Sequence, residues 1–175
     1  GGPLEVPWSA APFSSPAVLC VPDAGSGPAM ALVSHALARA DVDTTVYGLK
    51  LEAPPERASS NGREADRDGL EVLVERSAQL GATIRPLSFV STDPGEDICR
   101  TAEVKGADIV LLASKGPIDG AQLTDATALD VLRSATSTVG VLVASDFDEL
   151  ERVLVVRGPD DEAALDVASR IARPT

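Results

Sequence analysis

The sequence predicts an α/β fold: an open, parallel, five-stranded sheet with helices on both faces, followed by a C-terminal strand–helix unit. Short apolar runs alternate with segments in which apolar residues recur at helical spacing. Turns rich in Gly, Pro and Asp join them, and this alternation is typical of parallel strands linked by right-handed crossover helices. The apolar residues, 44% of the 175, are mostly Ala, Val and Leu, which suits helices packed on aliphatic strands.

Strands are expected at the continuous apolar runs. Ala17–Val21 is closed by Pro22 and suits a strand that is buried on both faces. Pro86 places the third strand at a sheet edge or a bulge, because proline cannot donate to a strand ladder. The expected strands are residues 17–21, 44–51, 82–90, 108–113 and 138–144.

Helices are expected between these strands. Pro28 suits a first helical position, after which Met30, Val33 and Leu37 form one apolar stripe. Asp93 and Glu96 flank Pro94 as a capping box would. The expected helices are residues 28–40, 69–80, 94–104 and 125–135, and residues 52–67 between them are polar and read as a loop.

The chain divides into a leader or linker at residues 1–15, a domain at residues 16–148 and a strand–helix unit at residues 149–175. The last unit, with a strand at 152–157 and a helix at 163–172, repeats the order found at 17–40. It is either the start of a second copy or a flap that completes the same domain. The missing initiator Met indicates a fragment of a longer protein, and whether Gly1 and Gly2 are tag remnants stays open.

Composition excludes several function classes. A net charge of −12 and an aromatic content of 3% argue against nucleic-acid binding, and the charge disfavours anionic lipid surfaces. No apolar run approaches the ~20 residues that span a bilayer, and the start of the chain is no signal peptide. Cys20 and Cys99 have no CxxC or His-rich neighbours, so we expect no metal site and a reduced cytoplasmic compartment.

No catalytic site can be assembled from the sequence. Ser26 lies between two glycines but lacks a strand–Ser–helix elbow with a base partner. His35 is the only histidine and lies off the apolar stripe, so an exposed position is expected. No paired carboxylates have a recognisable spacing. The protein is therefore not expected to be an enzyme.

A ligand site is nevertheless expected at one edge of the sheet. In doubly wound sheets, ligands bind beyond the carboxyl ends of the strands, where the strand order reverses. Three segments reach that edge: residues 22–27, 48–52 and 114–120.

Three stretches carry a resemblance to a known family. VLCVPDAGSGPAMALVSHALARA (residues 18–40), ADIVLLASKG (107–116) and VLRSATSTVGVLVA (131–144) resemble segments of the universal stress protein domain. The resemblance covers residues 16–145. It implies a Rossmann-like fold of the adenine nucleotide α-hydrolase kind, with an adenine-contacting Asp that matches Asp23.

The phosphate side of the site departs from the family pattern. Nucleotide-binding members carry Gly, two residues, Gly, nine residues, then Gly and Ser or Thr. Gly116 matches the first glycine, but Asp119 falls where the second belongs, and Asp125 and Ala126 replace the final pair. A carboxylate at a helix start would repel a triphosphate. The alternative is that Asp and Gly at these strand ends simply form turns.

The resemblance therefore implies a degenerate nucleotide site, with no certain cofactor; ATP, AMP or a cyclic dinucleotide remain candidate ligands. The candidate binding residues are Asp23, Ser26, Gly48, Ser114, Gly116 and Gly120.

Degenerate tandem domains of this kind resemble the cytoplasmic tails of bacterial cation/proton antiporters. The function implied is a non-catalytic regulatory or sensory domain of such a transporter, on the cytosolic face of the inner membrane. The partners implied are the membrane domain of the same chain and a second copy, paired through the strand from Thr138 to Ala144. A free-standing tandem stress protein that binds ATP is the alternative. A hydrolase-type enzyme would need a loop such as SGGxDS after the first strand, which residues 23–27 lack.

Overall fold

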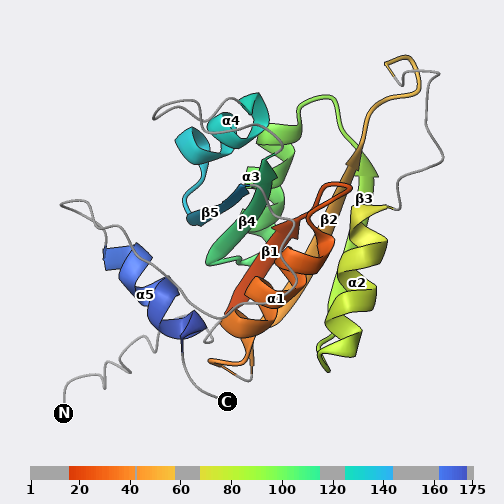
Figure 1. Ribbon diagram of the computed structural model, residues 1–175. Coiled ribbons are helices and arrows are strands. Elements are labelled where there is room, and N and C mark those ends of the chain that lie inside the picture. Colours follow the sequence, from red (N-terminus) through yellow and green to blue (C-terminus); the bar gives the residue numbers. More distant parts are fainter. Residues whose placement is uncertain (1–15, 42, 58–67, 115–124, 144–161, 173–175) are drawn as a thin grey trace, which may run out of the picture.

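The computed structural model describes residues 16–41, 43–57, 68–114, 125–143 and 162–172. Its centre is a parallel five-stranded sheet in the order β3-β2-β1-β4-β5 (Figure 1). The predicted parallel α/β architecture is confirmed. The strands are β1 (Ala17–Val21), β2 (Thr45–Glu52), β3 (Ile84–Val90), β4 (Ile109–Ser114) and β5 (Thr138–Val143).

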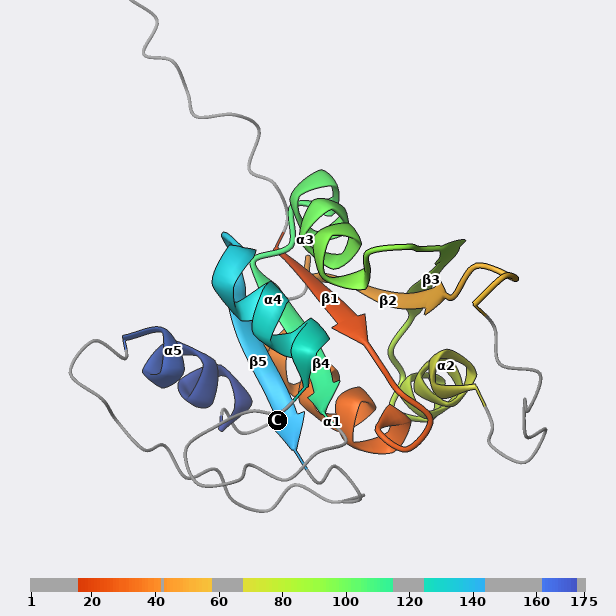
Figure 2. The ribbon, with the colours of Figure 1, turned by 90° about the horizontal axis from the view of Figure 1, so that it is seen from above.

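Helices cover both faces of this sheet. The helices α1 and α2 lie on one face, while α3 and α4 lie on the other (Figure 2). This follows from the strand order, since each helix links two parallel strands by a crossover. The helices are α1 (Gly27–Ala38), α2 (Gly69–Gln79), α3 (Pro94–Lys105), α4 (Ala126–Ser134) and α5 (Glu162–Ile171). Among the described residues, no helix is long and apolar enough to cross a membrane.

The hydrophobic core lies on both sides of the central strand β1. Val18 and Cys20 pack on the α1–α2 side and Leu19 on the α3–α4 side, and all three are fully buried. The alternation follows from the two-residue period of a strand. Burial raises the pKa of the Cys20 thiol to about 12, so this thiol stays protonated.

The sequence signals at element ends are mostly confirmed. Pro86 lies in β3, which is an edge strand as predicted. The Asp93 carboxylate caps α3 by accepting from the Glu96 amide at 3.1 Å. Gly106 ends α3 in the left-handed region at φ 63°, which glycine adopts readily.

The prediction for His35 was wrong. This side chain is half-buried, whereas one apolar stripe on α1 had predicted exposure. The reason is that α1 packs against the sheet, α2 and α5 at once, which covers most of its circumference. Even Ser34 beside it is buried, with its hydroxyl donating to the Ala31 carbonyl at 3.2 Å.

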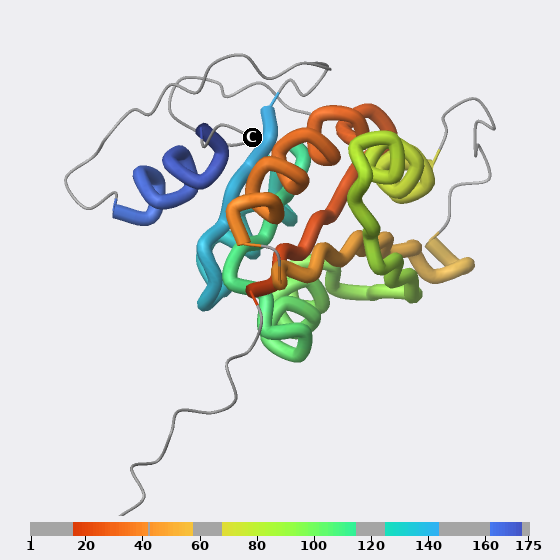
Figure 3. The backbone as a smooth tube through the Cα atoms, turned by 90° about the horizontal axis from the view of Figure 1, so that it is seen from below, coloured from red at the N-terminus to blue at the C-terminus, as the bar shows by residue number. Residues whose placement is uncertain are grey.

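The C-terminal helix is present, and it packs against the described part of the domain. Val167 and Ile171 of α5 pack against the core on the α1 side. Arg39, the C-cap of α1, donates to the Ile171 carbonyl at 3.1 Å, and Arg170 pairs with Asp108 at 3.4 Å. Figure 3 shows α5 beside α1 at the β5 side of the sheet. The strand expected at residues 152–157 lies outside the described residues.

An ion pair joins β2 to the start of α2. Lys50 Nζ lies 2.8 Å from Asp68 Oδ2, while Asp68 Oδ1 accepts from the Leu70 amide at 3.0 Å. The hydrogen bond with Lys50 is the main cause that lowers the pKa of Asp68 below its ordinary 3.8, and the same bond raises the pKa of Lys50. The Asp68 side chain thus caps α2 and tethers it to the sheet.

Replacing Asp68 by Ala is expected to lower the free energy of unfolding by about 1–2 kcal/mol at pH 7, because a helix cap and an ion pair are lost together. A group with a depressed pKa stabilises above its ordinary value of 3.8 and loses that effect as the pH falls through the folded value. The difference in the free energy of unfolding between wild type and Asp68→Ala should therefore become smaller in acid. Urea unfolding at several pH values measures it, and Asp93→Ala, which removes a cap alone, is the control.

Candidate functional site

The strand order places a topological switch point between β1 and β4. From β1 the chain proceeds to β2 and β3 on one side, and it returns through α3 to β4 and β5 on the other. Ligands of doubly wound sheets bind in the crevice at the carboxyl edge of such a point. We call this region the switch edge; it comprises the turn at residues 23–26, Ser114 at the end of β4, and the first turn of α4.

The turn at residues 23–26 is held by its own side chains. Asp23 Oδ1 accepts from the amides of Gly25 at 3.1 Å and Ser26 at 3.0 Å. In return, the fully buried Ser26 Oγ accepts from the Asp23 amide at 2.9 Å. These bonds fit the turn-forming interpretation of Asp23 and Ser26. The half-buried Asp23 carboxylate is thereby fixed at the end of β1.

Two glycines allow this turn and the start of α1 to lie in close contact with α2. A Cβ on Gly69 would lie 2.0 Å from the carbonyl oxygen of Asp23, and a Cβ on Gly27 would lie 2.7 Å from Val72 Cγ1. The backbone of α2 therefore supports the turn directly. No sequence pattern indicates this role, because Gly69 in the sequence only marks the start of a helix.

Ser114 carries an unsatisfied hydroxyl. The residue is only 4% exposed, and its Oγ has no hydrogen-bond partner within the part of the chain that the structure describes. Strand alternation after Val110 and Leu112 places its side chain on the α3–α4 side of the sheet, the side on which α4 begins. A buried polar atom without a partner is costly, so it points to a group that would pair with it.

The other predicted residues lie elsewhere. Gly48 is in the middle of β2, opposite Cys20, and not at a strand end, because β2 continues to Glu52. A Cβ on Gly48 would lie 2.5 Å from Leu70 Cδ1, so this glycine makes room for α2. Gly116 and Gly120 lie outside the described residues. The structure thus brings Asp23, Ser26 and Ser114 to the switch edge.

The start of α4 does not fit a triphosphate. Asp125 is the N-cap, and its Oδ1 accepts from the Ala128 amide at 3.0 Å. Ala126, the first helical residue, has no hydroxyl. A phosphate at a helix start needs unoccupied amides and positive potential, and here a carboxylate already takes one amide and supplies negative charge.

The same capping chemistry recurs along this edge of the sheet. Asp68, Asp93 and Asp125 each cap a helix with a side-chain oxygen. Lys50 of β2 carries a positive charge, but it is already paired with Asp68. Among the described residues no cluster of His, Cys, Asp or Glu could hold a metal ion. The edge is therefore acidic, and carboxylates cap the starts of α2, α3 and α4.

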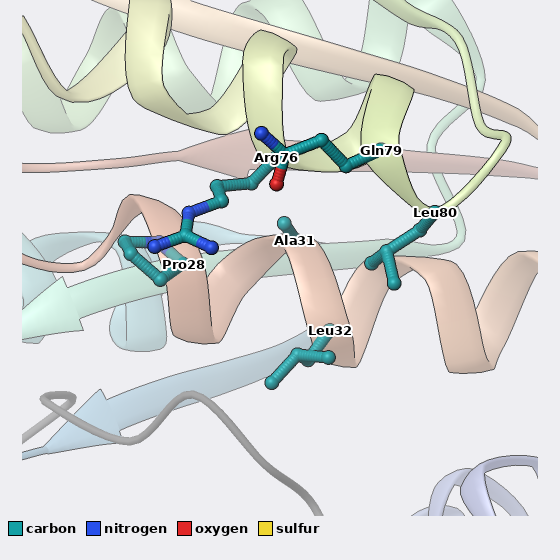
Figure 4. Close-up of a pocket in the computed structure, with 6 residues that line it drawn as sticks. All are labelled: Pro28, Ala31, Leu32, Arg76, Gln79 and Leu80. Carbon is teal, nitrogen blue, oxygen red and sulfur yellow. The ribbon is translucent and has the colours of Figure 1, made fainter.

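Two hollows lie away from the switch edge. A groove of about 80 Å³ lies between α1 and the C-terminal part of α2 (Figure 4). Its α1 side is lined by Pro28, Ala31 and Leu32, and its α2 side by Arg76, Gln79 and Leu80. A hollow of about 270 Å³ lies between α5 and the amino ends of β1 and β4. It is lined by Pro16, Ala40, Asp41, Asp108, Asp166 and Arg170.

Comparison with solved structures settles the fold. A universal stress protein from Archaeoglobus fulgidus superposes with a TM-score of 0.57 at 21% identity, over 72% of this chain and 96% of that chain. The chain has the universal stress protein fold. The universal stress protein from the same organism in complex with dAMP gives a TM-score of 0.53 at 19% identity, over 72% and 95% of the two chains. No protein-family model matches the sequence, and neither does any curated protein.

The universal stress protein fold accounts for the order of elements over residues 16–143. The expected Rossmann-like architecture is confirmed, and its switch point lies between β1 and β4.

Proposed function

We propose that this chain is a non-catalytic, ligand-sensing domain of the universal stress protein kind, which binds an adenine compound and regulates a larger protein. The observation that carries the proposal is the switch edge itself. The fixed Asp23 carboxylate and the Ser114 hydroxyl, which has no partner among the described residues, flank the switch point of a fold in which a similar structure holds dAMP.

Adenine is the chemistry that this edge supports best. The Asp23 carboxylate can accept from an exocyclic amino group, and its position is fixed by the turn rather than by solvent. The neighbouring Ser114 hydroxyl can both donate and accept. Such a few convergent polar groups at the end of a sheet are typical of small-molecule sites.

A regulatory role suits the residues better than catalysis. The Ser26 hydroxyl is engaged within its turn, and His35 lies on α1, away from the turn. We place the domain in the cytosol, attached to a cation/proton antiporter or related transporter. Among the described residues β5 is the last strand of the sheet, so its outer edge offers a seam for a second copy.

The second candidate is a free-standing tandem stress protein that binds ATP. The strand–helix order expected from the sequence of the tail favours a tandem arrangement, and α5 supplies its helix. The sequence of the full-length gene discriminates between the two: membrane-spanning segments upstream of residue 1 establish the transporter, and their absence establishes the free-standing protein.

Isothermal titration calorimetry with adenosine, AMP, ATP and a cyclic dinucleotide tests ligand binding, with guanosine as the control ligand. We expect adenine compounds to bind, guanosine to bind at least tenfold more weakly, and Asp23→Ala to abolish the signal. Equal binding of adenosine and guanosine would contradict the adenine assignment. For regulation, the ligand added to the full-length transporter in proteoliposomes should change the ion flux, and an unchanged flux would contradict it.

A further inference from the structure

Asp125 stands where α4 meets the switch edge, and its geometry bears on which adenine compound the site accepts. Its Oδ1 is 3.0 Å from the Ala128 amide, and the residue is half-buried. An amide in the first turn of a helix is the usual donor to a bound phosphate. Here that donor is taken by a side chain that carries a full negative charge.

The turn before α1 also uses backbone donors, although α1 itself has no side-chain cap. The amides of Gly25 and Ser26, which precede α1, both donate to Asp23. Two carboxylates therefore flank the switch point, one after β1 and one before α4, and each consumes backbone donors. With a net charge of −12 on the whole chain, the surroundings add further repulsion for an anion.

The group that lacks a partner at this edge is neutral. Ser114 Oγ is buried and unpaired among the described residues. A hydroxyl pairs well with a sugar hydroxyl or a ring nitrogen, and it carries no charge that would attract a phosphate. The backbone amides that Asp23 and Asp125 occupy, and the unpaired Ser114 hydroxyl, thus all favour an uncharged ligand.

We propose that the switch edge selects a neutral adenine nucleoside over its phosphorylated forms, and that Asp125 determines this selectivity. The proposal rests on the adenine ligand of the proposed function and names the form of that ligand. Removing the charge of Asp125 while keeping its cap should admit phosphate. Ser and Asn cap helices as well as Asp does, so Asp125→Ser and Asp125→Asn preserve the helix start.

The test measures the dissociation constants of adenosine, AMP and ATP by calorimetry, without Mg²⁺ and at fixed ionic strength. For the wild type, adenosine should bind about tenfold or more tightly than ATP. Asp125→Ser should narrow that ratio by about fivefold, through tighter ATP binding with adenosine unchanged, as expected for one charge at a helix start. Asp125→Asn should do the same, which keeps the test valid if one variant folds poorly.

Asp93→Ser is the matched control. It makes the same change at the N-cap of α3, which follows the edge strand β3 and not the switch point. It should leave the ratio of adenosine to ATP affinity unchanged. Raising the salt concentration should narrow the wild-type ratio, because the repulsion is electrostatic.

Three results would overturn the proposal: ATP binding more tightly than adenosine to the wild type, an unchanged ratio in both Asp125 variants, or an equal effect from Asp93→Ser. In each of these, adenine binding itself survives. If none of the three compounds binds to any of the proteins, the adenine ligand of the proposed function fails and this proposal falls with it.

Discussion

Replacing Gly69 by Ala is expected to lower the free energy of unfolding by about 3 kcal/mol, the upper end of what overpacking usually costs. The added Cβ would lie 2.0 Å from the Asp23 carbonyl oxygen and 2.6 Å from its carbon. These are backbone atoms, so no side-chain rotation relieves the clash. Helix propensity alone would stabilise the Ala variant by about 1 kcal/mol. A loss of stability would therefore show that the clash outweighs helix propensity. Urea unfolding followed by circular dichroism measures the change.

Gly25→Ala is the matched control for this prediction. Gly25 lies in the same turn, but a Cβ there would meet nothing within 4 Å. Its effect should stay within about 0.5 kcal/mol, as is usual for unstrained surface positions. Gly69→Ala should also weaken adenosine binding, because it displaces the turn that holds Asp23. Equal stability of the two variants would show that α2 does not support the turn at Gly69.

Replacing Leu19 by Ala is expected to cost about 2–5 kcal/mol, the range for truncating a fully buried leucine. Leu19 is in the central strand β1, between Tyr47 of β2 and Val110 of β4, and none of its surface is exposed. Its side chain packs in the core under α3 and α4. The loss in free energy of unfolding therefore shows whether α3 and α4 cover this face of the sheet. Urea unfolding measures that loss.

Leu132→Ala provides the comparison. Leu132 is on α4 and is 44% exposed, so the same truncation removes far less buried surface. We expect a loss of less than about 1 kcal/mol. A small loss at both positions would mean that α3 and α4 do not close over β1, and would contradict the two-faced architecture.

The sequence predicted the architecture because its signals are local. The apolar run at Ala17–Val21 matches β1 residue for residue, and Pro86 correctly marked β3 as an edge. The helix expected at residues 163–172 is also present, as α5. Each of these depends on neighbours close in the chain, which periodicity and turn chemistry report directly.

Long-range contacts were beyond the reach of the same signals. The contact of Gly69 with Asp23 joins residues far apart in the chain, and nothing in the spacing of either predicts it. His35 was misplaced because the packing of α5 and α2 on α1 is tertiary. Of the site, Asp23 and Asp125 could be predicted from the family pattern, but the unpaired hydroxyl of Ser114 is visible only in three dimensions.

The central claim, that an adenine ligand binds at the switch edge, is tested most directly by ¹H–¹⁵N correlation spectra recorded during a titration with adenosine. We expect shifts of the amide signals of Gly25, Ser26, Ser114 and Ala128, which come from three segments that meet at this edge. Signals around Arg170 and Leu80, in the two other hollows, should stay in place. Shifts confined to either hollow, with those four amides unchanged, would show that adenosine binds away from the switch edge.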